Sequence, residues 1–255
     1  MTGWIRRSRF RPALSACLAG ACLLLGQEGV ALAADDAIPA TAGTALYQSI
    51  PPTRDGIGRV YMGREIAQVM GWQGAEWLER APREQEERPD LLLADLHLAA
   101  DMVIADIGAG SGYLTRRLAP LVPQGHVYAV DVQPQMVEML QGLARATAMK
   151  NVLPVLGTNT DVRLPPSSVD LAILVDVYHE LEFPVEVTRS LVRALKPHGK
   201  IVFVEYRGED PQVAIKPLHK MSVSQLRREM SPQALQWERT DEPLPLQHIV
   251  VFSKR

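Results

Sequence analysis

Residues 102–113 read Met-Val-Ile-Ala-Asp-Ile-Gly-Ala-Gly-Ser-Gly-Tyr, and this stretch decides the fold. The short apolar run Met102–Asp106 predicts a buried strand. Three glycines follow at alternate positions, Gly108, Gly110 and Gly112. Glycine lets the backbone turn tightly and approach a ligand closely, and a helix beginning near Tyr113 presents free N–H groups at its first turn. The stretch therefore predicts a strand, a ligand-binding turn and a helix.

The alternation of strands and helices continues beyond this stretch. Seven segments read as strands: Met102–Asp106, His126–Asp131, Val152–Leu156, Leu171–Asp176, Ile201–Tyr206, one near Leu235–Thr240, and Ile249–Ser253. The first five are almost continuous apolar runs, as expected where helices cover both faces of a parallel sheet. Only Asp241–Pro245 joins the last two, which is too short for a parallel crossover and predicts an antiparallel hairpin at one edge. The predicted fold is α/β, with a doubly wound, seven-stranded, mostly parallel sheet and a reversed last strand.

The glycine loop departs from the dinucleotide-binding pattern G-x-G-x-x-G. Its third glycine comes one residue early, Tyr113 stands where that pattern has glycine, and the acid Asp106 lies two residues before the loop. With these residues the chain resembles the class I S-adenosylmethionine-dependent methyltransferases, whose motif is acid-x-Gly-x-Gly-x-Gly between the first strand and the first helix. The resemblance extends from about Asp90 to Ser253 in strand order, and its Rossmann-like fold includes the reversed final strand. An NAD-dependent oxidoreductase is the more distant alternative.

The resemblance implies S-adenosylmethionine as the cofactor and assigns residues to it. The three glycines would pack against its amino-acid and ribose portion, and Asp131, which ends the second strand, would accept hydrogen bonds from the ribose hydroxyls. Asp161 matches the acid that meets the adenine amine, with Asn159 or Thr160 as alternatives. Asp106 would act through the loop backbone and the methionine ammonium group.

A charge argument supports the same cofactor. The predicted strand ends carry three carboxylates, Asp106, Asp131 and Asp176. Carboxylates attract a ligand that carries a sulfonium and an ammonium group, whereas they repel the diphosphate of NAD. The site is therefore expected to bind a cation.

Residues 176–180 follow the fourth strand and should face the methyl acceptor, because ligands of doubly wound sheets lie beyond the carboxyl ends of the strands. His179 is a candidate base for an acceptor that carries a proton, with Glu180 or Asp176 orienting it. The alternative is a histidine that only caps or packs. Tyr178 is a candidate for positioning the substrate, or a core residue.

Further candidates lie around the same rim. Three residues end the fifth strand, Glu205, Tyr206 and Arg207, and a proline-bounded segment with Lys216, His219 and Lys220 is a candidate lid. Arg207 and Lys216 could meet a carboxylate or phosphate of the substrate, although a solvated loop is the alternative. By resemblance alone, the N-terminal extension offers Tyr61, Met62, Arg64 and Glu65 for the acceptor site.

Residues 1–33 predict a signal peptide. Four arginines precede an apolar run over Pro12–Gly26, and Ala31-Leu32-Ala33 supplies small residues for cleavage. Export to the periplasm or beyond is therefore expected, with an uncleaved membrane anchor as the alternative. Residues 34–89 are predicted to form an arm and a helical extension, helical over Ile57–Glu87, with the charge run Arg83–Arg88 as a solvated helix face. The methyltransferase domain would cover residues 90–255.

Composition limits the partners that the sequence predicts. The chain has 255 residues and a formal net charge of −2; without residues 1–33, 23 basic and 28 acidic residues give −5. No global cationic field would recruit nucleic acid or anionic lipid, so we expect no nucleic-acid partner, and membrane contact only through the signal segment. The six histidines show no metal-ligand spacing, and no metal site is expected. The predicted function is methylation of a small molecule; an exported, non-catalytic binding module is the alternative.

Overall fold

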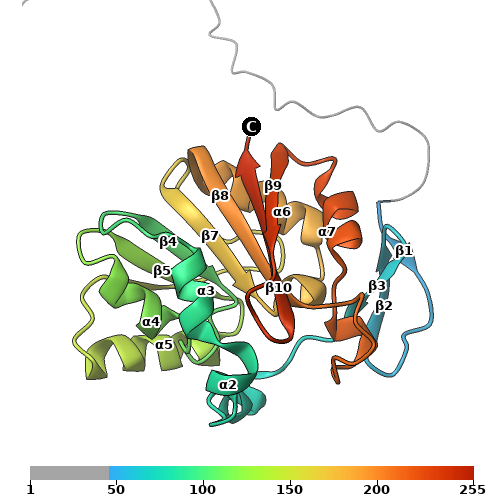
Figure 1. The fold of residues 1–255 in the computed structure, drawn as a ribbon, viewed down its shortest axis with the longest axis horizontal. Coiled ribbons are helices and arrows are strands. Elements are labelled where there is room, and N and C mark those ends of the chain that lie inside the picture. The colour runs from blue at the N-terminus through green and yellow to red at the C-terminus, as the bar shows by residue number, and fades with distance from the viewer. Residues whose placement is uncertain (1–45) are drawn as a thin grey trace, which may run out of the picture. The chain divides into compact units, whose positions relative to one another are not determined.

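A seven-stranded sheet forms the centre of the structure, a computed structural model that describes residues 46–255 (Figure 1). Its spatial order is β6-β5-β4-β7-β8-β10-β9, and β10 runs antiparallel to both of its neighbours. The strands are β4 (Val103–Ile107), β5 (His126–Asp131), β6 (Val152–Leu156), β7 (Val169–Val175), β8 (Leu195–Tyr206), β9 (Leu235–Asp241) and β10 (Gln247–Lys254). The predicted fold class, including the reversed last strand and the terminal hairpin, is confirmed.

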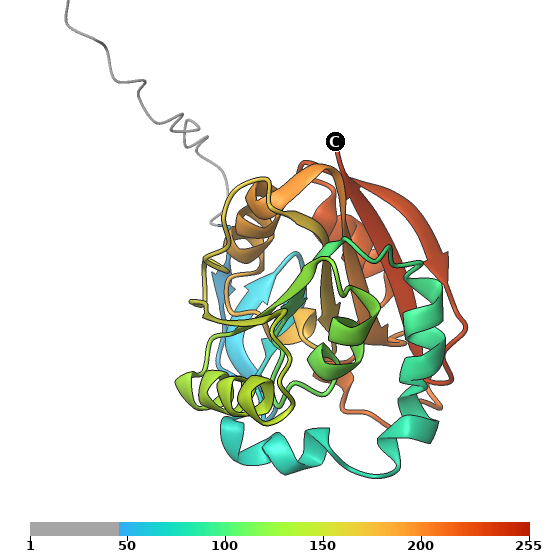
Figure 2. The ribbon, with the colours of Figure 1, turned by 90° about the vertical axis from the view of Figure 1, so that its left-hand side faces the viewer.

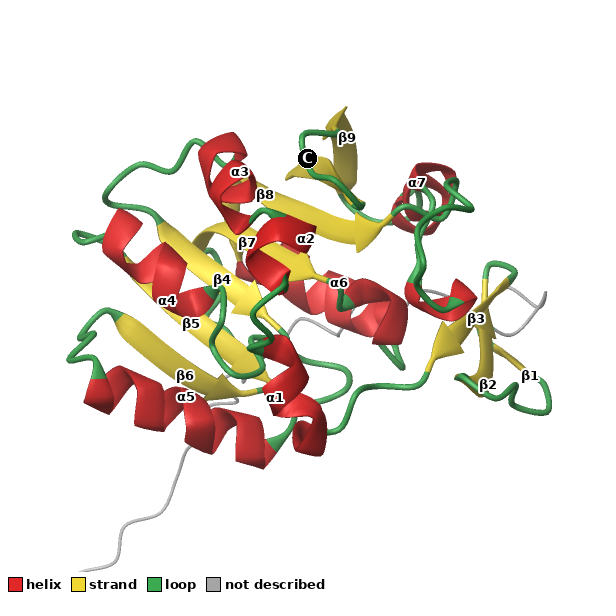
Figure 3. Ribbon diagram, turned by 60° about the horizontal axis from the view of Figure 1, so that its bottom comes forward, coloured by secondary structure: helices red, strands yellow, loops and turns green. Residues whose placement is uncertain are grey.

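Helices cover both faces of this sheet (Figure 3). One face packs against α3 (Pro89–Asp95), α4 (Thr115–Leu118) and α5 (Pro134–Ala146). The other packs against α6 (Pro184–Ala194) and α7 (Val223–Met230). Because both faces are covered, central strand residues such as Ile104 and Phe203 are fully buried. The carboxyl ends of the parallel strands are thereby left as the place where side chains can meet a ligand.

The segment predicted as helical from residue 57 begins instead as a small antiparallel sheet, and that prediction is wrong for its first part. The strands are β1 (Gln48–Ser49), β2 (Gly56–Tyr61) and β3 (Arg64–Ala67). Tyr61 pairs with Arg64, so Met62 and Gly63 form a two-residue turn with φ of 47° and 87°. A turn with both φ values positive favours a hairpin, and this local signal overrides the near-helical spacing of apolar residues.

Short helices follow the hairpin, in the part of the predicted extension that is helical. They are η1 (Trp72–Gly74), α1 (Ala75–Leu78) and α2 (Arg83–Glu87), and Figure 2 shows this segment running below the main sheet. The prediction of a solvated face for the charge run is wrong at two positions, because Arg83 and Glu87 are 7% and 5% exposed. Arg83 Nε donates to Glu87 Oε2 at 2.7 Å. Pairing makes the burial of both charges possible.

The predicted signal peptide, residues 1–33, lies outside the described residues. Among residues 46–255, no helix has the length and apolar character needed to cross a membrane.

Candidate active site

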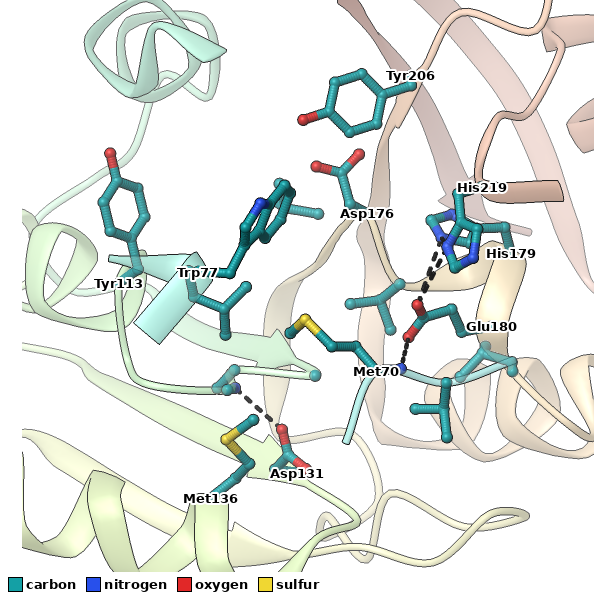
Figure 4. A pocket seen from close by; sticks show the side chains of 18 of the residues that line it. Met70, Trp77, Tyr113, Asp131, Met136, Asp176, His179, Glu180, Tyr206 and His219 are labelled. Carbon is teal, nitrogen blue, oxygen red and sulfur yellow. Dashed lines mark hydrogen bonds and ion pairs between the residues drawn. The ribbon is translucent and has the colours of Figure 1, made fainter. Parts of the chain in front are cut away.

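A cavity of about 590 Å³ lies at the carboxyl ends of the central strands (Figure 4). Four strands place a lining residue there: Gly108 after β4, Asp131 at the end of β5, Asp176 after β7 and Tyr206 at the end of β8. The N-terminal arm adds Gln68, Val69, Met70, Trp77, Leu78 and Arg83, and the later loop adds Ala214, Ile215, Lys216 and His219. This volume is in the range of roughly 300–1,000 Å³ that is typical of small-molecule sites.

Two glycines of the loop line the cavity, and the third allows close packing against a helix. Gly108 and Gly110 line the cavity with φ of 67° and 56°, which favour glycine. Gly110 donates its N–H to Asp131 Oδ2 at 3.0 Å. Gly112, also expected beside the cofactor, does not line the cavity: a Cβ there would lie 2.5 Å from Leu143 Cδ2 of α5. Its role is the close approach of the loop to that helix.

Two carboxyl groups next to this loop are buried. Asp131 is 6% exposed, and its Oδ1 accepts the Gln133 N–H at 2.9 Å. Asp106 is 3% exposed, and its Oδ2 accepts the Thr115 hydroxyl at 2.6 Å. Burial raises the pKa of Asp131 and raises that of Asp106 to about 6. Both residues line the cavity, as the sequence predicts for cofactor ligands.

Asp176 presents an acceptor without a partner. Its backbone φ is 54°, an uncommon value for a residue with a side chain. Its Oδ2 accepts from Gln247 Nε2 at 2.7 Å, whereas its buried Oδ1 has no hydrogen-bond partner among the described residues. Burial, followed by the charges of Glu87 and Glu205, raises the pKa of this carboxyl group well above its usual range. Such an acceptor fits a ligand that brings a cationic or hydrogen-bond-donating group.

Arg83 is a cavity residue that sequence reasoning missed. Its guanidinium lies over the ring of Tyr113, 3.9 Å from the centroid, and its Nη1 donates to the Leu78 carbonyl at 2.8 Å. Tyr206 donates to Glu87 Oε1 at 3.2 Å and so joins the Arg83–Glu87 pair. Arg83 thus brings a positive charge into a cavity that is otherwise rich in carboxylates.

Two predicted site residues do not reach the cavity. The carboxylate of Asp161 is held by the Arg163 N–H, by Ser190 and by Arg193, at 2.7–3.0 Å. Tyr178 is 1% exposed and donates to Glu229 Oε2 at 2.8 Å. Neither residue lines the cavity, so we correct the adenine role of Asp161 and the substrate role of Tyr178. Tyr178 is the core residue that was the alternative.

His179, Glu180 and His219 come together on one side of the cavity (Figure 4). His179 and Glu180 lie in η3 (Tyr178–Glu180), directly after β7, and His219 ends η4 (Pro217–His219). His179 Nε2 is 3.2 Å from His219 Nδ1, and Glu180 Oε1 lies 3.8 Å and 3.4 Å from these two nitrogens. The sequence did not reveal this cluster, because 40 residues separate the two histidines.

Buried carboxylates hold His179. Its Nδ1 lies 2.5 Å from Glu205 Oε2, and the other oxygen of Glu205 accepts the Tyr178 N–H at 2.9 Å. Burial alone would lower the pKa of His179, but Glu205, Glu180 and Asp176 oppose it and raise the pKa above the ordinary value. Glu205, which we predicted only to reach the rim, thus orients the candidate catalytic histidine.

The candidate acceptor residues of the hairpin lie outside the cavity lining. Tyr61 is buried with Ile66 and Val185, and Glu65 Oε1 accepts N–H groups of its own hairpin region. Arg64 binds Glu229 through Nε at 2.8 Å and donates from Nη1 to the His179 carbonyl at 3.0 Å. The arm contributes the later residues 68–70 instead, and Arg64 supports the backbone of His179 from behind.

The predicted lid only partly lines the cavity. Lys216 and His219 face it, and Lys216 Nζ pairs with Asp55 Oδ1 at 2.7 Å. Lys220 points into its own loop and donates to the carbonyls of residues 210 and 213. Arg207 donates to the carbonyls of residues 244 and 245, so its predicted contact with an anionic substrate is not supported.

Comparisons with known proteins agree with this architecture. A family model described as a methyltransferase domain matches residues 105–203. An S-adenosylmethionine-dependent methyltransferase from Aquifex aeolicus superposes with a TM-score of 0.69 at 22% identity, covering 73% of this chain and all of that one. The fibrillarin-like rRNA/tRNA 2'-O-methyltransferase of Methanosarcina mazei is 27% identical over 69% of this chain and 76% of its own length.

Two other relatives match over a shorter region. The malonyl-[acyl-carrier protein] O-methyltransferase of Halalkalibacterium halodurans is 31% identical over 48% of this chain and 45% of its own length. The protein-L-isoaspartate O-methyltransferase of Pyrococcus horikoshii is 30% identical over 44% of this chain and 48% of its own length. This chain therefore spans about half the length of these two relatives.

Residues 105–203 thus match a methyltransferase domain, and the fold is that of the class I S-adenosylmethionine-dependent methyltransferases. The chain is a methyltransferase enzyme with S-adenosylmethionine as its cofactor, as the sequence predicts. Nothing in these matches supports the alternatives of a binding module or an NAD-dependent oxidoreductase. The expected restriction to small-molecule partners, without nucleic acid, is contradicted, because the relatives are named for RNA and protein acceptors.

The residues in the cavity fit this cofactor. Asp131 stands at a strand end with two carboxylate oxygens, which suit a ribose diol, and the unpartnered Asp176 Oδ1 suits a cationic group. Arg83 can pair with a carboxylate of an amino-acid moiety. When bound, S-adenosylmethionine supplies a methyl group activated by a sulfonium, and the residues of the cavity would serve to align it with the acceptor.

Proposed function

We propose that the protein transfers the methyl group to an oxygen atom of an acceptor that binds beside His179, Glu180 and His219. The observation that carries this proposal is that one cavity is lined both by Asp131 and the glycine loop and by these three side chains. A donor held by Asp131 and the glycine loop would therefore share the cavity with an acceptor held by the three side chains. Methyl transfer is an in-line displacement, which requires donor and acceptor to be aligned within one such cavity.

The named relatives support oxygen as the acceptor atom. All seven curated relatives are named as O-methyltransferases, with RNA, protein or acyl-carrier-protein acceptors. A hydroxyl acceptor must lose its proton when the new bond forms. The cluster of imidazole and carboxylate groups is suited to that task, because each group carries lone pairs that can accept a proton or bind a cation in its place.

Apolar side chains surround the cluster and limit the access of water. Val177 and Leu181 flank His179 and Glu180 in sequence and line the cavity, and Met70 of the arm lies beside Glu180 (Figure 4). A dry surrounding strengthens electrostatic interactions and keeps water from competing with the acceptor oxygen. The arm therefore completes the acceptor half of the site.

The test is methyl transfer from S-adenosylmethionine labelled in its methyl group. The full chain is incubated separately with bulk tRNA, with isoaspartyl peptides, with malonyl-acyl carrier protein and with phenolic and carboxylic small molecules. We expect label in at least one arm, on oxygen: base-labile if the product is an ester, stable if it is an ether. Asp131→Ala serves as the control with weakened cofactor binding and should transfer less label. Label found only on nitrogen, carbon or sulfur would contradict the proposal.

We also propose that the enzyme is exported by residues 1–33. A fusion of residues 1–40 to mature β-lactamase should confer ampicillin resistance on a Gram-negative host, since that reporter works only outside the cytoplasm. Leu24→Arg, which places a charge in the apolar run, should abolish resistance. N-terminal sequencing of the exported product should begin at Ala34. Equal resistance from both fusions would contradict export by this segment.

A further inference from the structure

We infer that His179 Nε2, Glu180 Oε1 and His219 Nδ1 form a binding site for one divalent transition-metal ion of the zinc type, with its open coordination position toward the acceptor. The three atoms stand 3.2, 3.4 and 3.8 Å apart. This inference deepens the proposed function. The role given to the ion rests on that function, whereas the binding of the ion does not. It also revises the expectation that the chain has no metal site.

The spacing of the three atoms suits a tetrahedral ion. Bonds of about 2.1 Å at tetrahedral angles separate neighbouring ligand atoms by about 3.4 Å, in the middle of the observed distances. Two histidines and one glutamate are a donor set found in catalytic zinc sites, where the fourth position is left to water or substrate. All three residues line the cavity, so a fourth ligand can approach from it.

Neighbouring groups orient the ligand atoms. Glu205 is fully buried and its carboxylate lies against His179 Nδ1, so Nε2 is the ring nitrogen that faces the cluster. The carboxylate–histidine–metal arrangement recurs in metal sites and fixes the ring. On the other side, Glu180 Oε2 accepts the Met70 N–H at 3.3 Å, which leaves Oε1 for the cluster.

A hydrogen bond between the histidines explains less of the geometry. One proton can bridge His179 Nε2 and His219 Nδ1, but Glu180 Oε1 then lies only at ion-pair distances of 3.8 and 3.4 Å from these nitrogens. An ion at the centre serves all three atoms at once. The charges also favour an ion: Glu180 and Glu205 face His179, whereas the nearby cations Arg64 and Lys216 are already paired with Glu229 and Asp55.

An ion in this site would give the oxygen acceptor its activation. An acceptor hydroxyl at the open position becomes more acidic and releases its proton to solvent. The oxygen lone pair then forms the new bond to the methyl carbon, the carbon–sulfur bond breaks, and its electron pair stays on sulfur. No oxidant or reductant is required.

The experiment titrates Co²⁺ into metal-stripped full-length protein, without cofactor or acceptor. We expect one ion per chain and an intense visible absorption band typical of tetrahedral Co²⁺, which Zn²⁺ displaces. His219→Ala and Glu180→Gln should each weaken binding at least 10-fold, and Glu205→Gln, which only disturbs the orientation of His179, about 10- to 100-fold. The matched control is His97→Ala, because His97 is exposed and far from the cluster in sequence.

Thermal unfolding of each variant separates loss of the site from loss of the fold. The His219→Ala variant is the most informative, because the loop that carries His219 is exposed and its change should disturb the fold least. Absence of saturable one-to-one binding, or equal binding by His219→Ala, would overturn the inference. Transfer to oxygen that persists in metal-free protein would overturn the activating role of the ion while leaving the proposed function intact. Metal binding without any oxygen acceptor would instead contradict the proposed function alone.

Discussion

Gly110 donates its backbone N–H to Asp131 Oδ2 at 3.0 Å, which ties the turn after β4 to the end of β5 beside the cavity. The first residue of this pair belongs to the glycine loop and the second stands 21 positions later. The bond fixes the Asp131 carboxylate at the strand end, where the cofactor's hydroxyl groups are expected. It also links the glycine loop to the acid that ends the second strand of the main sheet, two features that are separate signals in the sequence.

Asp131→Ala should weaken S-adenosylmethionine binding by about 1–3 kcal/mol, the usual cost of losing hydrogen bonds to a charged group. Isothermal titration calorimetry of the full chain measures this directly. Asp161→Ala is the matched control, because its carboxylate is bound by neighbouring residues outside the cavity lining. Equal affinity of the Asp131 variant and the wild type would refute the ribose assignment.

Arg83→Met should reduce both stability and cofactor affinity. The free energy of unfolding should fall by about 3 kcal/mol, the lower end of the usual range for removing one member of a buried ion pair. The lower end is expected because Glu87 keeps a second partner, Arg80, at 2.7 Å. Urea unfolding and calorimetry report the two effects. Arg88→Met, which breaks only the exposed pair with Asp90, should leave both quantities near wild type. Unchanged cofactor affinity in Arg83→Met would remove Arg83 from the binding site.

Two glycine-to-alanine variants should change the free energy of unfolding in opposite directions. Gly112→Ala should lower the free energy of unfolding by about 1–2 kcal/mol or more, because φ is 84° and the new Cβ would meet Leu143. Gly142→Ala in α5 should raise it by about 0.5–1 kcal/mol, since nothing lies within 4 Å of the added atom. Chemical denaturation checks both. A neutral Gly112→Ala would show that the loop does not need its close approach to α5.

The buried Asp106 should make stability depend on pH. Burial raises its pKa from 3.8 to about 6, so the folded state keeps a proton that the unfolded state releases between these values. The free energy of unfolding should therefore fall as pH rises from about 4 to 6, by up to about 3 kcal/mol. Asp106→Asn should make this slope shallower in urea titrations at several pH values.

Asp161→Asn provides the contrast for that measurement. The Arg163 N–H, Ser190 and Arg193 lower the pKa of Asp161, so this carboxyl group titrates below the window from pH 4 to 6. Its replacement should leave the slope in that window unchanged. A steeper slope in Asp106→Asn than in the wild type would contradict the raised pKa of Asp106.

The main sheet could be predicted because its signals are local. Strands such as His126–Asp131 and Val152–Leu156 are apolar runs with the observed bounds, and the glycine loop follows its strand directly. The hairpin over Gly56–Ala67 was missed because near-helical spacing of apolar residues outweighed the Met62-Gly63 turn. A glycine at the second turn position was the available signal.

The site was only partly predictable because its members come from distant segments. Asp131 and His179 follow strands of the parallel sheet, so the fold rule places them at the cavity. Arg83 and His219 come from the arm and the late loop, and no periodicity links either segment to the strand ends. Arg83 resembled a surface charge in sequence: its pairing with Glu87 is an i,i+4 contact within α2, but only the tertiary fold buries the pair.

Met70 joins the two halves of the cavity through its backbone. Its N–H binds Glu180 Oε2 on one side at 3.3 Å, and its carbonyl accepts from Gln133 Nε2 on the other at 3.0 Å. A change at either contact would therefore be felt at the other through a single residue, so the cofactor side and the acceptor side of the cavity are mechanically coupled at this point of the arm.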